Sequence, residues 1–256
     1  MSIDEKFTTE TITHLHTWTP NLFTLRTTRF KGYKFVPGQF ARLGLRKGDK
    51  IVWRAYSILS ANYDDFLEFY SIVVPEGEFT SELANLHVGD EILIDKIAYG
   101  ALTTDRFVNG KDLWMLSTGT GLAPFISVLY DFNVWEQYDN IILVHCAREK
   151  DELAYEELIH SFHDNEYYQE YSHKLKYVQT VTRETVPNTL NARITELLEN
   201  GELEKHVGIP LDIERSRIMI CGNPDMVDDT RHLLTQKGLT LSKRSAPGNF
   251  AVEQLW

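Results

Sequence analysis

The sequence contains only two cysteines, Cys146 and Cys221, and neither belongs to a Cys-x-x-Cys pair. Two isolated cysteines cannot build a zinc ribbon or a ferredoxin-type iron–sulfur cluster, and they provide no disulfide framework. A chain without a disulfide framework is typical of a reducing compartment. We therefore expect no bound metal and a cytoplasmic location.

Long apolar runs and an excess of positive charge are also missing. No apolar run approaches the length of a membrane-spanning helix, and the first residues lack the apolar segment of a secretion signal. The 26 lysines and arginines are outnumbered by 37 aspartates and glutamates, so the formal net charge is −11. Because nucleic-acid binding needs a basic field, we expect neither a nucleic-acid nor a membrane partner.

The first part of the 256-residue chain consists of short segments of alternating hydrophobicity with turn residues between them. Such spacing predicts an antiparallel β-barrel or sandwich. The expected strands are Thr9–His16, Leu22–Thr28, Gln39–Leu45, Trp53–Leu59, Phe66–Val74 and Glu91–Lys96, with one short helix over Phe79–Leu86.

From about Leu113 the pattern changes, and apolar strands alternate with segments of helical period. This alternation predicts right-handed βαβ units and an open, parallel five-stranded sheet. The expected strands are Leu113–Ser117, Ile141–Ala147, Leu175–Val181, Arg217–Gly222 and Phe250–Gln254, and the expected helices are Pro124–Tyr138, Leu153–Phe162, Ile194–Leu203 and Asp225–Lys237. The polar stretch Tyr99–Lys111 joins the two parts, so we expect a β-barrel domain over residues 1–104 and an α/β domain over residues 105–256.

A glycine-rich turn follows the first α/β strand, within the stretch Leu113–Ser127. A helix N-terminus presents unpaired N–H groups that suit a phosphate, and Gly119 and Gly121 would let a ligand approach the backbone. Pro124 stands where the dinucleotide fingerprint has its third glycine. By itself the turn is equally well an ordinary strand–helix connection.

A second turn of small residues, Cys221–Met226, follows the fourth α/β strand. Open parallel sheets bind ligands beyond the carboxyl ends of their strands, so the two turns together could frame one dinucleotide. The ligand contacts expected from the two turns are Gly119, Gly121, Gly222, Asn223, Pro224 and Asp225.

Three arginines follow the second and third α/β strands, where the ribose of a dinucleotide would be recognised. Arg148, Arg183 and Arg193 together suggest a 2′-phosphate and hence NADPH, although Glu149 is the residue type that suits a 2′-hydroxyl. Each charge-assisted hydrogen bond contributes about 1.5–3 kcal/mol, so two would favour NADPH over NADH by roughly a hundredfold or more. Any one of them alone is an ordinary surface charge.

The barrel part carries a set of residues that suits a flavin dinucleotide. Arg54-Ala55-Tyr56-Ser57 lies on an expected strand, Tyr70 on a later one, and Gly77–Ser81 at a helix start. The arginine and the helix-start N–H groups would hold a pyrophosphate, Tyr56 would stack on the isoalloxazine, and Ser57 would bond near N5. Taken separately, the same residues are a barrel aromatic, a solvated charge and a capped turn.

Four motifs occur together in a recognisable order: Arg-Ala-Tyr-Ser, Gly-Glu-Phe-Thr-Ser, Gly-Thr-Gly-Leu-Ala-Pro and Cys-Gly-Asn-Pro-Asp-Met. With them the chain, from about Phe7 to Trp256, resembles the ferredoxin–NADP+ reductase family, and in particular its compact bacterial members, also called flavodoxin reductases. The resemblance implies an oxidoreductase with FAD on the barrel, NADP(H) on the α/β domain and a C-terminal extension over the flavin.

The resemblance also assigns individual residues. The implied FAD contacts are Arg54, Ala55, Tyr56, Ser57, Tyr70, Glu78, Phe79, Thr80 and Thr120, and the implied NADPH contacts are Ala147, Arg148, Thr182, Arg183 and Arg193. The last two residues, Leu255 and Trp256, are implied to lie on the flavin, with Trp256 against the adenine. Ser57, Cys221 and Glu253 are the expected catalytic residues, Glu253 through the resemblance alone.

The implied reaction passes a hydride from NADPH to FAD and then single electrons to a separate ferredoxin or flavodoxin, since the chain holds no cluster of its own. Such a carrier is typically acidic, and the basic residues that could meet it are Arg42, Arg46, Lys47 and Lys50. We expect a monomer. The alternatives are an NADH-preferring reductase for a cytochrome or oxygenase and a non-catalytic flavin-binding regulatory module.

Overall fold

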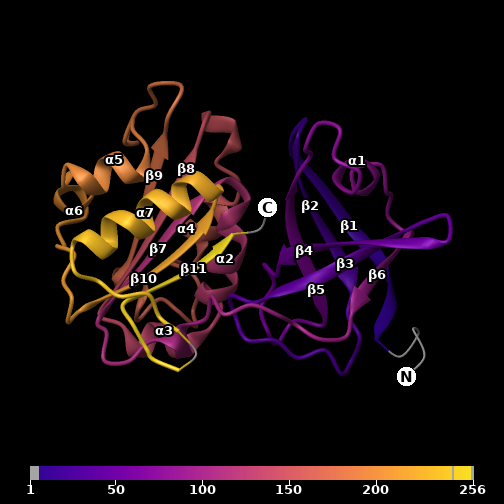
Figure 1. Ribbon diagram of the computed structural model, residues 1–256, viewed down its shortest axis with the longest axis horizontal. Coiled ribbons are helices and arrows are strands. Elements are labelled where there is room, and N and C mark those ends of the chain that lie inside the picture. Colours follow the sequence, from indigo (N-terminus) through magenta and orange to yellow (C-terminus); the bar gives the residue numbers. More distant parts are fainter. Residues whose placement is uncertain (1–5, 244, 255–256) are drawn as a thin grey trace.

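The computed structural model describes residues 6–243 and 245–254, which form two halves, each built on one sheet (Figure 1). The N-terminal half has a six-stranded antiparallel sheet, and the C-terminal half has a five-stranded parallel sheet with helices on both faces. Leu255 and Trp256 lie outside the described residues. Within the described part of the chain, no helix is both long and apolar enough to cross a membrane.

The N-terminal sheet curls so that its two edge strands meet. Its strands are β1 (Phe7–Thr19), β2 (Leu22–Thr28), β3 (Phe40–Lys47), β4 (Lys50–Ser57), β5 (Phe66–Ile72) and β6 (Glu91–Asp95), in the order β4-β3-β6-β1-β2-β5. An antiparallel bridge between Ile58 and Phe69 joins the ends of the order, and the N–H of Leu59 donates to the carbonyl of Glu68 at 2.8 Å. The predicted barrel-like sheet is therefore confirmed.

The C-terminal sheet has the predicted parallel arrangement. Its strands are β7 (Asp112–Thr118), β8 (Asn140–Ala147), β9 (Leu175–Val181), β10 (Ser216–Gly222) and β11 (Phe250–Gln254), in the order β11-β10-β7-β8-β9. The chain builds outward from β7 to β9 and then returns to the other side of β7, so the strand order reverses between β7 and β10. Open sheets bind ligands at such a reversal.

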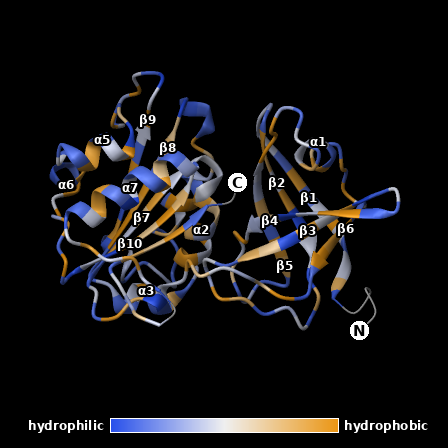
Figure 2. Cartoon of the chain, viewed as in Figure 1, coloured by the Kyte–Doolittle hydropathy of each residue, from blue (hydrophilic) through white to orange (hydrophobic). Residues whose placement is uncertain are grey.

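Two helical layers cover this sheet because consecutive residues of a strand face opposite sides. The helices are α2 (Ala123–Leu129), α3 (Phe132–Gln137), α4 (Glu156–Ser161), α5 (Ile194–Glu199), α6 (Glu202–Val207) and α7 (Pro224–Gln236). On β7, Leu113 and Met115 share a core with α2, α3 and α4, whereas Trp114 and Leu116 share one with α5, α6 and α7. Figure 2 shows hydrophobic residues concentrated on the central strands between these layers.

Two of the helix predictions are wrong, because each expected helix is divided into two in the structure. The segment expected as one helix over Pro124–Tyr138 forms α2 and α3, because Asp131 adopts an extended conformation and caps α3 with its side chain. The segment Ile194–Leu203 forms α5 and begins α6, because Gly201 has a φ of 76° between them. Left-handed glycine and N-capping aspartate both end one helix and allow the next to begin.

The other boundaries differ by shorter stretches. The helix expected over Phe79–Leu86 is reduced to α1 (Thr80–Leu83). The helix expected from Leu153 begins at Glu156, after a 3-10 turn over Lys150–Glu152 and a left-handed Tyr155. The glycine-rich turn itself forms a 3-10 helix over Gly119–Leu122, and α2 follows it directly.

We predict that Asp131→Ala lowers the free energy of unfolding by about 1 kcal/mol, a typical value for loss of an N-cap. The Asp131 carboxylate accepts from the backbone N–H of Asn133 at 3.1 Å and from its side-chain amide at 2.8 Å. Asp131→Asn keeps an acceptor at this position and should cost less. Urea unfolding of the three proteins tests this, and equal stability of the Ala and Asn variants would contradict the capping role.

Candidate functional site

Two adjoining cavities lie where the halves meet. The larger, of about 350 Å³, opens beyond the carboxyl ends of β7, β8, β9 and β10, and the smaller, of about 190 Å³, lies on the barrel. Both cavities are lined in part by Ile72 of the barrel and Thr120 of the α/β half. A ligand in one cavity is therefore next to a ligand in the other.

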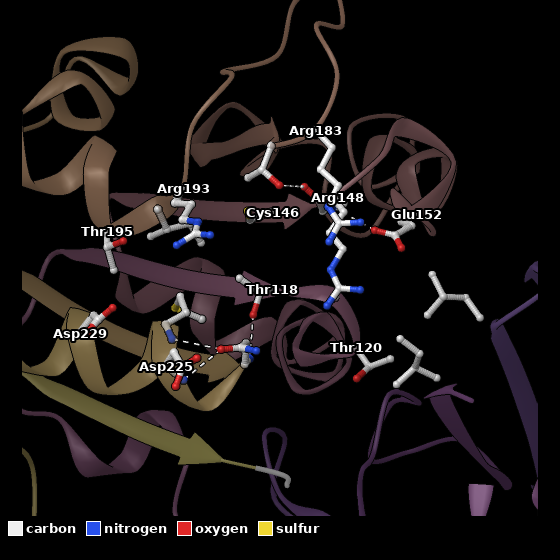
Figure 3. Close-up of a pocket in the computed structure, with 18 residues that line it drawn as sticks. Thr118, Thr120, Cys146, Arg148, Glu152, Arg183, Arg193, Thr195, Asp225 and Asp229 are labelled. Carbon is white, nitrogen blue, oxygen red and sulfur yellow. Dashed lines mark hydrogen bonds between the residues drawn. The ribbon is translucent and has the colours of Figure 1, made fainter. Parts of the chain in front are cut away.

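The larger cavity collects residues from four separate strand ends. The predicted nucleotide contacts that line it are Gly119, Ala147, Arg148, Thr182, Arg183, Arg193, Asn223 and Asp225, and the predicted flavin contact Thr120 lines it as well. Figure 3 shows Arg148, Arg183 and Arg193 in this cavity, and the N–H of Arg183 donates to the carbonyl of Arg148 at 2.9 Å. The cluster expected from the sequence thus forms in space. Gly121, Gly222 and Pro224 are not among the lining residues.

Two acidic residues of this cavity, Glu152 and Asp229, were missed by sequence reasoning. Glu152 accepts from the N–H groups of Arg148 at 2.9 Å and Glu149 at 3.4 Å, which completes a capping box around the 3-10 turn. Its spacing of three residues from Glu149 is a recognisable signal. Asp225 lines the cavity with Asp229, one helical turn later on α7 (Figure 3), and the i,i+4 spacing could have identified the second from the first.

The two glycine-containing turns touch each other backbone to backbone. A Cβ added at Gly121 would lie 2.3 Å from the carbonyl oxygen of Cys221, and one added at Gly222 would lie 2.1 Å from Oγ1 of Thr118. That hydroxyl oxygen also accepts from the N–H of Asn223 at 2.8 Å. Gly121 and Gly222 therefore allow the ends of β7 and β10 to pack together, a role different from the predicted close approach of a ligand.

The smaller cavity is lined by all the predicted flavin contacts except Leu255 and Trp256, which lie outside the described residues. The predicted contacts that line it are Arg54, Ala55, Tyr56, Ser57, Tyr70, Glu78, Phe79, Thr80 and Thr120. Among residues 6–243 and 245–254, the buried hydroxyls of Ser57, Tyr70 and Thr120 have no hydrogen-bond partner. Buried polar groups are normally paired, so three unpaired hydroxyls on one cavity fit a polar ligand such as a flavin dinucleotide.

Ser57, Cys221 and Glu253 come together where the two halves of the molecule meet, a region that we call the seam. Cys221 and Glu253 are register partners on β10 and β11, and a Cβ on Gly100 of the barrel would lie 2.7 Å from Oε2 of Glu253. Burial raises the pKa of Glu253 to about 8. Burial, and then the Glu253 charge, raise the pKa of Cys221 well above its ordinary value. Both groups therefore favour their protonated forms at neutral pH.

Comparison with known proteins places this geometry in context. Residues 115–232 match the sequence model of the oxidoreductase NAD-binding domain. Ferredoxin–NADP reductase A of Sorangium cellulosum is 41% identical over 97% of this chain and 90% of its own length. Flavodoxin/ferredoxin–NADP reductase of Escherichia coli is 37% identical over 96% of this chain and 97% of its own. The crystal structure of a ferredoxin NADP+ reductase from Neisseria gonorrhoeae with bound FAD and NADP has a TM-score of 0.92, with 37% identity, and covers 98% of this chain and 99% of that one.

We predict that Gly121→Ala separates the two turns and destabilises the fold by about 1–3 kcal/mol, the usual cost of overpacking. Gly119→Ala is the matched control, because a Cβ there meets nothing within 4 Å, although its φ of 53° costs about 1 kcal/mol. Binding of adenosine 2′,5′-bisphosphate, followed by calorimetry, should weaken more for Gly121→Ala. Equal effects of the two substitutions would contradict the contact.

We predict that the burial of Glu253 makes the parent protein less stable as pH rises. Its pKa is about 8 instead of 4.5, so stability present below pH 4.5 is lost as pH rises through about 8. Glu253→Gln carries no charge and lacks this loss. Its stability relative to the parent should increase by on the order of 2–4 kcal/mol between pH 5 and 9, at about 1.4 kcal/mol per unit of pKa shift. Urea unfolding at both pH values measures the difference, and parallel pH profiles would contradict the shift.

Proposed function

The chain belongs to the ferredoxin–NADP reductase family, and we propose that it exchanges electrons between NADP(H) and a separate ferredoxin or flavodoxin through bound FAD. The observation that carries the proposal is the pair of cavities that meet at Ile72 and Thr120. One has a cluster of arginines and the other has unpaired hydroxyls, so each half offers a site for one of two adjacent cofactors.

The barrel residues suit FAD. Bound FAD would supply the redox chemistry, since its ring system accepts two electrons as a hydride and releases them one at a time. The hydroxyls of Ser57, Tyr70 and Thr120 would bond its polar atoms, and Arg54 would lie near its diphosphate. Thr120 belongs to the α/β half, so both halves would hold the same cofactor.

The arginine cluster supports NADPH over NADH. Arg148, Arg183 and Arg193 provide positive charge for a 2′-phosphate, which a nucleotide with a 2′-hydroxyl does not need. Glu152 and Asp229 line the same cavity and would repel a phosphate, so the phosphate belongs beside the arginines. This charge distribution orients the nucleotide within its cavity.

The seam residues would shape the contact between the two cofactors. At neutral pH the carboxyl of Glu253 and the thiol of Cys221 both hold their protons, because burial raises both pKa values. A hydride transfer requires no general base, and a buried, uncharged seam excludes water from the transfer. Ser57, Cys221 and Glu253 thus act on position and environment.

The carrier protein would bind to exposed basic residues of the barrel. Of the four basic residues considered, Lys47 is paired with Glu78 at 2.9 Å and Glu82 at 3.5 Å. Arg42 lies 4.0 Å from an oxygen of Asp95. We therefore propose the exposed Arg46 and Lys50 as the principal docking charges for an acidic carrier.

The oligomeric state, the domain boundary and the location of the protein are part of the same proposal. We propose a monomer, because one chain lines both cavities, and a boundary between two domains near residue 104. We also propose a cytoplasmic location, which the free thiols of Cys146 and Cys221 support.

Reduction of the purified, FAD-loaded protein under anaerobic conditions tests the function. NADPH should bleach the flavin absorbance and NADH should do so much more slowly. Equal rates would overturn the preference for NADPH, and a protein that neither contains nor takes up FAD would overturn the whole proposal. Reduction of an added ferredoxin or flavodoxin by NADPH then tests the second half of the reaction.

We predict that Arg193→Ala raises KM for NADPH by about tenfold, since one charge-assisted hydrogen bond contributes about 1.5–3 kcal/mol and the side chain is exposed. KM for NADH should be unchanged, because NADH lacks the 2′-phosphate. Arg231→Ala is the control, because Arg231 is an exposed residue of α7 that pairs with Asp228. An equal rise for both nucleotides would show that Arg193 does not recognise the 2′-phosphate.

A further inference from the structure

One side chain of the α/β half packs against the outer face of the barrel. Tyr155 precedes α4, yet its ring packs against Tyr70 of β5, with ring centroids 5.3 Å apart, and against Trp18 of β1, at 4.8 Å. It is 6% exposed. Because its contacts lie on the other half of the molecule, Tyr155 ties the two halves together.

The Tyr155 hydroxyl completes a hydrogen-bonded chain on the outer face of the barrel, where it meets the α/β half. The indole N–H of Trp18 donates to Oγ1 of Thr24 at 2.8 Å, Thr24 is bonded to the Tyr155 hydroxyl, and that hydroxyl donates to Oε1 of Glu68 at 3.3 Å. Glu68 is buried and also pairs with Arg26. This polarity uses each hydroxyl proton once, and it leaves the Glu68 carboxylate satisfied by donors on two sides.

The backbone of Tyr155 is held in a rarely adopted conformation. Its φ of 65° lies in the left-handed region, which side chains with a Cβ avoid. Residues stay in such conformations where surrounding contacts impose them, and these positions are common at functional sites. Here the left-handed turn directs the side chain toward the outer face of the barrel, where it contacts Trp18, Thr24 and Tyr70.

The same short segment carries both Tyr155 and part of the nucleotide cavity. Arg148 and Glu152 line that cavity, and the Glu152 carboxylate bonds the N–H of Arg148, so the segment from Arg148 to Tyr155 is internally braced. At its far end Tyr155 packs on Tyr70, which lines the flavin cavity. One segment therefore connects a wall of each cavity.

We propose that Tyr155 is a positioning residue that sets the nucleotide cavity relative to the flavin cavity through its bonds to Thr24 and Glu68. This role rests on the proposed function. The affinity of the arginines for a nucleotide does not depend on how the two cavities are placed relative to each other. The rate of hydride transfer does, since a small misplacement of the reacting groups lowers it strongly. Loss of the hydroxyl should therefore separate nucleotide affinity from the rate of flavin reduction.

The central experiment compares Tyr155→Phe with the parent, both loaded with FAD. Affinity for adenosine 2′,5′-bisphosphate, which probes the arginine cavity alone, should stay within about twofold. The rate of flavin reduction by NADPH should fall by roughly tenfold to a hundredfold. The long-wavelength absorbance that a nicotinamide in contact with flavin produces should decrease as well, and a merely structural loss of stability would not change this absorbance.

Two further variants keep the test decisive. Thr24→Val removes the partner hydroxyl from the barrel side, so it should reproduce the effect even where Tyr155→Phe folds poorly, and the double variant should add little because both act on one bond. Tyr138→Phe is the control, since Tyr138 is a buried phenol that precedes β8 at the opposite end of the sheet, and it should behave like the parent.

The outcomes distinguish the two proposals. A parent that binds FAD but is not reduced by NADPH would overturn the proposed function and the positioning role with it. A normal parent, with reduction rate and long-wavelength absorbance unchanged in both Tyr155→Phe and Thr24→Val, would overturn the positioning role alone.

Discussion

The backbone contact between the ends of β7 and β10 is the constraint on which the rest of the site depends. Gly121 packs on the carbonyl of Cys221 and Gly222 packs on Thr118, at separations that no Cβ allows. This contact closes the point where the strand order reverses, and it directs the 3-10 helix toward the barrel. Thr120 of that helix then lines both cavities. The position of the site thus follows from two residues that have no side chain.

Several buried polar groups at the seam have no hydrogen-bond partner within the described residues of the protein. Ser57, Tyr70, Thr120 and Glu253 each have a buried oxygen without a partner in the described residues. Such groups cost folding free energy, about 1–3 kcal/mol each, when they remain unpaired. A ligand that pairs them stabilises the folded chain by the same amount, so cofactor binding and folding are linked in this part of the molecule.

The fold was predictable from the sequence to the extent that its signals are local. Every expected strand is present, because alternation and apolar runs report burial of each segment directly. The division of two expected helices also has local causes, the N-cap Asp131 and the left-handed Gly201. The periodicity of the hydrophobic residues does not by itself reveal either position. By contrast, the packing of Gly121 on Cys221 and the pairing of Lys47 with Glu78 join segments far apart in the chain. The order of the motifs along the chain identified the candidate site residues. Only the folded geometry distinguishes a residue that lines a cavity from one that packs against another part of the backbone.

Each half of the molecule contributes residues to the cavity of the other. Leu22 and Ile72 of the barrel line the larger cavity, while Thr120 lines the smaller cavity and Tyr155 packs on Tyr70, which forms part of its wall. Neither half by itself can therefore present a complete site. The hydrogen bond from Ser127 of α2 to the carbonyl of Ser60 adds a further link at 2.9 Å. Since hydride transfer depends on the separation of the reacting groups, the reaction requires that the two halves be held together at several points.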